Sequence, residues 1–167
     1  LMAELYMSQK DFARAEDMFK KAAQADPKNP AYRKNLASFY EMNGKPGQSA
    51  EVLQSMSKEQ PGDASVKKQI AALHLDQKRW AEGLKVIEEV LKADPRDADA
   101  LVLKTRLLLG QGNNDAAISA AQAAVNADPK SVAARYVQGE AYKAKDPKSL
   151  MIEASLNEAI KADPKNV

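Results

Sequence analysis

Residues 93–97 read ADPRD, and residues 127–131 read ADPKS. The same tripeptide, Ala-Asp-Pro, recurs at residues 25–27 and 162–164, and Gln60-Pro61 stands at the intermediate position. These turns place prolines 34, 34, 34 and 35 residues apart, at Pro27, Pro61, Pro95, Pro129 and Pro164. A fixed period of this length indicates a tandem repeat.

Each of these turns is expected to end one helix and to begin the next. Proline has no backbone N–H and pushes the residue before it out of the helical region. A residue whose side chain can cap a new helix follows two positions after each proline. These candidate caps are Asn29, Asp63, Asp97, Ser131 and Asn166.

A second break falls near the middle of each repeat, at residues 43–44, 77–78, 111–112 and 145–147. Gly44 and Gly112 can adopt the left-handed conformation that ends many helices. Between the breaks, apolar residues recur three and four positions apart, and no alternating run predicts a strand. We therefore expect helices over 1–8, 11–24, 31–42, 48–59, 64–76, 81–92, 98–109, 115–126, 132–144 and 149–161.

The composition excludes several classes of function. The 167 residues include no cysteine and one histidine, so we expect no metal, no cofactor and no catalytic residue. The 25 basic and 23 acidic residues are interspersed, which argues against a nucleic-acid-binding protein. No apolar run approaches the roughly 20 residues that span a bilayer, so direct membrane insertion is not expected.

The repeated positions resemble the tetratricopeptide repeat family. Residues that match its pattern are Tyr6, Ala15, Phe19, Ala22, Leu36, Ala37, Tyr40, Gly44, Ile70, Ala71, Trp80, Gly83, Leu101, Leu108, Gly112, Ala117, Ala124, Gly139, Tyr142 and Ala159. Departures are Arg33 in place of tryptophan, Met56 in place of alanine, His74 in place of tyrosine and Lys104 in place of leucine. We interpret His74 and Trp80 as packing residues.

The resemblance implies an all-α fold, a right-handed α-solenoid of antiparallel helix pairs. The first helix of each pair would line a concave groove and the second would form the convex back. About four and a half repeats would form a single domain over residues 1–167, divided as 1–29 (partial), 30–63, 64–97, 98–131 and 132–166. Each repeat would bury its apolar face against the next one.

The alanine-rich repeats and residues 101–111 are similar to long repeat arrays in bacterial lipoproteins and in exopolysaccharide or secretion machinery. We expect a piece of a longer bacterial array. The absence of cysteine is compatible with the cytoplasm and with the periplasm, so the compartment stays open. Weak end-to-end self-association is expected through apolar residues near the two ends, Leu1, Met2, Tyr6, Ile152, Leu156 and Ile160.

Groove-facing positions of the first helices carry the binding residues in this family. Transferred to this sequence, they are Lys34, Asn35, Ser38, Lys68, Gln69, Val102, Leu103, Arg106, Tyr136 and Glu140. Cations, amides and apolar side chains suit a peptide or protein segment, extended or helical, with acidic groups and an apolar anchor. The resemblance thus implies a non-catalytic protein-interaction scaffold. The alternative is an assembly or spacer arm of a larger protein or enzyme complex whose activity lies elsewhere.

Overall fold

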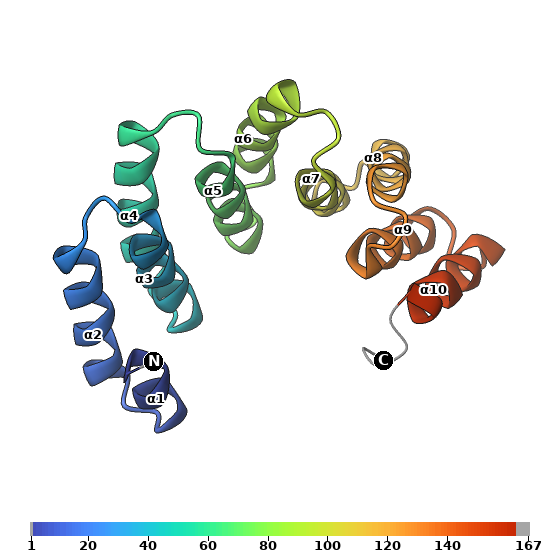
Figure 1. Cartoon of the computed structure of the whole chain (residues 1–167). Coiled ribbons are helices and arrows are strands. Elements are labelled where there is room, and N and C mark those ends of the chain that lie inside the picture. Colours follow the sequence, from blue (N-terminus) through green and yellow to red (C-terminus); the bar gives the residue numbers. More distant parts are fainter. Residues whose placement is uncertain (1, 163–167) are drawn as a thin grey trace. The chain divides into compact units, whose positions relative to one another are not determined.

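The computed structural model describes residues 2–162, and every regular element in that range is a helix (Figure 1). The ten helices of this range lie within two residues of the expected ends. They are α1 (Met2–Ser8), α2 (Phe12–Ala25), α3 (Pro30–Met42), α4 (Pro46–Glu59), α5 (Ala64–Asp76), α6 (Trp80–Ala93), α7 (Ala98–Gly110), α8 (Asn114–Ala127), α9 (Val132–Lys145) and α10 (Leu150–Ala162). Leu1, Pro164 and Asn166 lie outside the described residues.

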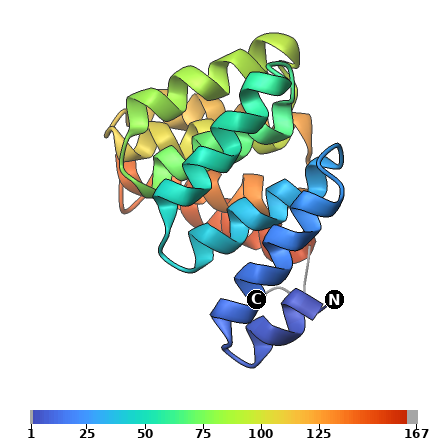
Figure 2. The same cartoon turned by 90° about the vertical axis from the view of Figure 1, so that its left-hand side faces the viewer.

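The chain divides into two compact units, and the division falls inside α5. Unit 1 is Leu1–Leu73 and unit 2 is His74–Val167. Within each unit, helices that follow one another in the chain pack as neighbours. Figure 2 shows α1 beside the start of α2 at the N-terminal end of unit 1. The single domain expected over residues 1–167 stays a prediction.

Two side-chain caps in succession build the turn between repeats. The Asp94 carboxylate accepts a hydrogen bond from the Arg96 N–H at 2.9 Å and holds the turn around the proline. Asp97 then accepts from the Ala100 N–H at 2.9 Å and starts α7. Equivalent caps, as expected from the sequence, are formed by Asn29, Asp63 and Ser131.

The turns at Lys10, Gly44, Lys78 and Gly112, which lie within repeats, each contain a residue with positive φ. Gly44 (φ 67°) and Gly112 (φ 74°) take this conformation, as expected. Lys10 (φ 58°) and Lys78 (φ 57°) take it without being glycine. The last repeat turns differently, because Asp146 accepts a hydrogen bond from the Lys148 N–H at 3.0 Å around Pro147.

The core of unit 1 is built on aromatic and small side chains. Phe39 is buried in α3, and its ring lies 5.2 Å from that of Phe19 in α2. Ala15 and Ala37 are fully buried, which lets the helices approach closely. A second cluster joins α4 to α5 through Leu53, Met56, Val66 and Leu73 around Ala37.

Glu16 ties three segments of unit 1 together. Its carboxylate lies 2.7 Å from Lys20 Nζ in α2 and 2.6 Å from Lys45 Nζ, just before α4. The Tyr40 hydroxyl of α3 donates to the same carboxylate at 3.4 Å. The Glu16 side chain is only 16% exposed. The hydrogen bonds from Lys20 and Lys45 hold the pKa of Glu16 at about 2, well below its ordinary value.

Small side chains also bring the helices of unit 2 together. Ala117 and Ala121 of α8, with Ala134 and Ala141 of α9, are fully buried in one cluster with residues of α7. Trp80, at the start of α6, packs on the last residue of α7. A Cβ atom on Gly110 would lie only 2.6 Å from Trp80 Cδ1, so the indole occupies the space of a side chain at this position.

Two departures from the expected repeat pattern are ion pairs between the helices of one unit. Arg33 contacts both carboxylate oxygens of Glu59 in α4, at 2.5 and 2.9 Å, and donates to Ser55 at 3.0 Å. The Nζ of Lys104 in α7 lies 3.6 Å from the Glu88 carboxylate of α6. In both places a long charged side chain stands at a position where the repeat pattern has an apolar residue, and it links two helices.

The contact between Trp80 and Gly110 makes position 110 intolerant of a side chain. We expect Gly110→Ala to lower the free energy of unfolding of the chain by about 1–3 kcal/mol, because the methyl group must displace the indole. Denaturant unfolding followed by circular dichroism measures this loss. The matched control is Gly47→Ala in α4, where a Cβ would meet no atom within 4 Å. An equal loss in the two variants would contradict the packing described for Trp80.

The carboxylate of Glu16 should make unit 1 sensitive to acid. Its pKa is lower in the folded chain than in the unfolded chain, so the unfolded chain takes up the proton first. The stabilisation is therefore complete above pH 4.5 and is lost as the pH falls towards 2. Glu16→Gln should cost about 1 kcal/mol at pH 7 and should flatten the stability profile between these pH values. Identical profiles for the two proteins would refute the role of Glu16.

Candidate functional site

The residues expected to bind a partner divide between the two units. Those of unit 1 lie on α3 and α5, and those of unit 2 lie on α7 and α9. The unit 1 set is Lys34, Asn35, Ser38, Lys68 and Gln69. The unit 2 set is Val102, Leu103, Arg106, Tyr136 and Glu140. That the two sets of residues align along one face stays a prediction.

In unit 1, Lys34 is committed to a contact within the fold. Its ammonium lies 3.1 Å from the Asp63 carboxylate, and the two side chains are 21% and 19% exposed. Asp63 also accepts hydrogen bonds from the N–H groups of Ser65 and Val66, as the cap of α5. Burial alone would raise the pKa of Asp63, but Lys34 and these two amides together hold it below its ordinary value. Lys34 therefore helps to join α3 to α5.

The amide of Gln69 links the same two helices and leaves one acceptor unused. Gln69 Nε2 donates to the Ser38 hydroxyl at 3.4 Å. Gln69 Oε1 is buried and has no hydrogen-bond partner in the described part of the chain. Lys68 is partly buried and already engaged in an interaction, whereas Asn35 is exposed. Asn35 is thus the exposed amide of this set, and the unpaired acceptor of Gln69 is buried.

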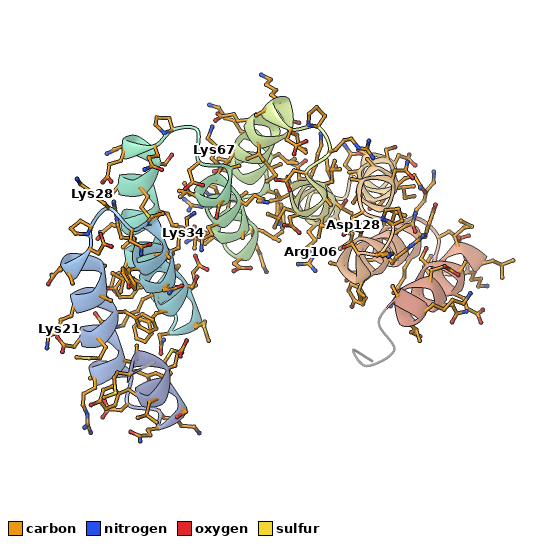
Figure 3. The ribbon with its side chains drawn as sticks, in the orientation of Figure 1. Lys21, Lys28, Lys34, Lys67, Arg106 and Asp128 are labelled. Carbon is orange, nitrogen blue, oxygen red and sulfur yellow. The ribbon has the colours of Figure 1, made fainter. Side chains whose placement is uncertain are left out.

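The unit 2 set separates into core and surface residues. Val102 is 7% exposed and belongs to the core cluster between α7, α8 and α9. Leu103 and Glu140 are partly buried, and Tyr136 is 49% exposed. Arg106 is exposed and extends from α7 into solvent (Figure 3). Its guanidinium makes no hydrogen bond or ion pair with residues 2–162, unlike Lys34.

A cavity of 520 Å³ lies beside these surface residues in unit 2. Residues from α7, α9, α10 and the turn between α9 and α10 line it: Leu109, Tyr136, Gly139, Glu140, Lys143, Ala144, Pro147, Ile152 and Leu156. Leu109 lies one helical turn after Arg106, so the free cation and the apolar cavity share one face of α7. Lys143 was not expected from the sequence, although its spacing from Tyr136 and Glu140 places it on the same face of α9.

His74 and the acidic side chains are the other groups that could take part in catalysis or metal binding. His74 is partly buried, and its Nδ1 is buried without a hydrogen-bond partner among the described residues. Burial, followed by the nearby Arg79, holds the pKa of His74 below its ordinary value and favours the neutral ring. Within residues 2–162, no three His, Cys, Asp or Glu side chains gather where they could hold a metal ion. None of the described helices combines the length and apolar character needed to cross a membrane.

Solved structures with the same fold are available for comparison. A thermophilic TPR protein of Thermus thermophilus, TTC0263, matches with a TM-score of 0.83 at 15% identity, over 99% of this chain and 90% of that one. MamA 41-end from Desulfovibrio magneticus RS-1 matches with a TM-score of 0.71 at 20% identity, over 96% and 89%. A tetratricopeptide repeat protein from Parabacteroides merdae ATCC 43184 matches with a TM-score of 0.74 at 20% identity, over 99% and 65%. At these identities the likeness shows the fold alone.

The sequence itself identifies the family. A search of the curated proteins found no match. The sequence profile described as "Tetratricopeptide repeat" matches residues 6–73 and again residues 74–144, which together are most of the chain. The helix pairs, the capped proline turns and the small residues at helix contacts all agree with that match. The chain therefore belongs to the tetratricopeptide repeat family.

Proposed function

We propose that this chain is a non-catalytic scaffold that binds a segment of another protein through exposed faces of its first helices. Tetratricopeptide repeats generally serve as protein-interaction scaffolds, which supports this proposal at the level of the family. The sequence contains no cysteine, and the single histidine, His74, has its Nδ1 buried without a hydrogen-bond partner among the described residues. The surface of the helices is therefore the part of the chain that would contact a partner.

The proposal rests on the position of Arg106, which lies on α7 next to the apolar cavity. The guanidinium is exposed and has no partner among the described residues, and Leu109 and Tyr136 begin the apolar cavity one turn away. Arginine and tyrosine are enriched among the residues that dominate binding energy at interfaces. A segment that places an apolar side chain in the cavity and a carboxylate near Arg106 would satisfy both groups.

The candidate residues of unit 1 offer a bound segment hydrogen-bonding groups more than they offer charge. Lys34 is held by Asp63, so it contributes less to attracting an acidic segment than its sequence position implies. The exposed amide of Asn35 can pair with the backbone of a bound segment. A buried acceptor without a partner costs about 1–3 kcal/mol. A rotation of the Gln69 side chain that pairs its unused oxygen with the bound segment would therefore be favourable. In this proposal Arg106 supplies the steering charge.

Selection of peptides on the whole chain tests the proposal. The probe is a displayed library of random peptides of about 16 residues, long enough for about four helical turns. We expect the selected peptides to combine an acidic residue with a bulky apolar one. Their affinity, measured by calorimetry, should fall at least about tenfold with Arg106→Glu and with Tyr136→Ala, since each should lose about 1.4 kcal/mol of binding energy or more.

The matched control is Lys92→Glu, which makes the same change of charge at an exposed position of α6 in the same unit. It should leave the affinity unchanged. Added salt should weaken the original protein more than Arg106→Glu, because a screened charge no longer attracts the segment. Equal losses in the two charge variants, with no effect of Tyr136→Ala, would show that binding does not use this face.

A further inference from the structure

Two adjoining cavities lie between α2 and α4 in unit 1, with volumes of 640 and 450 Å³. Pro27, Arg33 and Glu59 line both of them, so the cavities meet at the ion pair of Arg33 with Glu59. Helix α3 packs against both α2 and α4, and Figure 2 shows the three helices side by side. We call the two cavities together the α2/α4 groove.

The two ends of the α2/α4 groove carry opposite charges. Glu51 of α4 lines the larger cavity, and Lys28, which Figure 3 labels in the turn between α2 and α3, lines the smaller one. Both side chains are exposed, and neither makes a hydrogen bond or an ion pair with another described residue. Gln60 lines the same cavity as Lys28, so the groove follows α4 from Glu51 to its end at Gln60. This stretch of helix is about 13 Å long.

Apolar side chains form the floor between these two charges. Leu36 of α3 is 8% exposed, and Ala23 and Val52 pack partly exposed against the same cluster. The exposed amides of Gln24 and Gln60 line the larger and the smaller cavity, respectively. The groove thus combines an apolar middle with hydrogen-bonding groups and a charge at each end.

The charges of the α2/α4 groove are not required for packing of the helices. Arg33, Glu51 and Glu59 have uncharged counterparts 68 residues later, in unit 2, namely Leu101, Ser119 and Ala127. Leu101 is 7% exposed and belongs to the core cluster of that unit, so an apolar side chain suffices at the position of Arg33. The polar lining therefore points to recognition of another molecule.

We propose that the α2/α4 groove binds an extended segment of a partner protein that has a basic and an acidic residue four positions apart and an apolar residue midway between them. Alternate side chains of an extended chain point to the same side, so these three residues would all face the groove. Four residues of extended chain span about 13 Å, which matches the length of α4 along the groove.

Each part of the segment has a counterpart in the α2/α4 groove. The basic residue would pair with Glu51, the acidic residue with Lys28, and the apolar residue would contact Val52. An extended backbone leaves its own N–H and C=O groups unpaired, and the amides of Gln24 and Gln60 can bond to them. This groove lies on second helices of unit 1, so it is a site separate from the one proposed around Arg106.

A short synthetic peptide tests the pattern. The probe is acetyl-Ser-Lys-Thr-Leu-Thr-Glu-Ser-amide, in which threonine favours the extended conformation. Added to the whole chain at up to about 10 mM, it should shift the methyl NMR signals of Leu36 and Val52 saturably, because so few contacts give about millimolar affinity. The matched control has the same composition in the order Ser-Lys-Leu-Thr-Thr-Glu-Ser. It should bind about tenfold more weakly, since its leucine points away from the groove.

Charge reversal in the chain identifies the end that reads the basic residue. Glu51→Lys should weaken binding of the probe at least about threefold, because an attraction becomes a repulsion. A peptide with glutamate in place of the lysine should regain affinity for this variant, which a merely structural effect of the substitution would not produce. Lys28→Glu should likewise weaken the probe, whereas Glu153→Lys, at an exposed position of α10, should not.

Three outcomes would overturn the inference. The first is the absence of a saturable shift of Leu36 and Val52, and the second is equal affinity for the two peptide orders. The third is a loss with Glu51→Lys that the reversed peptide does not restore. Each of these leaves the proposed function standing, because Arg106→Glu should not change binding of this probe.

Discussion

The capped proline turn is the constraint on which the rest of the structure depends. One carboxylate holds the backbone around the proline, and a second cap two residues later starts the next helix, as Asp94 and Asp97 do. Because the turns between repeats have the same length, apolar residues one period apart lie on equivalent faces of their helices. Alanine and glycine can then stand where helices approach most closely, as Ala117 does between α8 and its neighbours.

The sequence allowed most of the fold to be predicted, because its signals are local. Asn29 and Ser131 cap helices, and Gly44 and Gly112 have positive φ, through interactions that span only a few residues. The left-handed conformation of Lys78 follows from the length of the turn between α5 and α6 and has no sequence signal. The ion pair of Arg33 with Glu59 likewise joins residues far apart in the chain.

The candidate site was less predictable, because a position on a helix face does not reveal what its neighbours occupy. Lys34 has the expected place on α3, but its ammonium forms an ion pair with the carboxylate of Asp63, which lies at the start of α5. Val102 has the expected place on α7, but it is buried in the core cluster with residues of α8 and α9, whereas Tyr136 of α9 is 49% exposed. The cavity around Leu109, Ile152 and Leu156 depends on three helices together, so no single stretch of sequence could indicate it.

The indole of Trp80 has a practical consequence. It is the only tryptophan of the chain, and both Trp80 and Gly110, on which it packs, belong to unit 2. Its fluorescence emission therefore reports the packing of α6 on α7, whereas circular dichroism sums the helices of both units. Comparing the two signals during one denaturant titration resolves whether the two units melt as one cooperative block or in succession. The chain thus carries its own spectroscopic label for half of its structure.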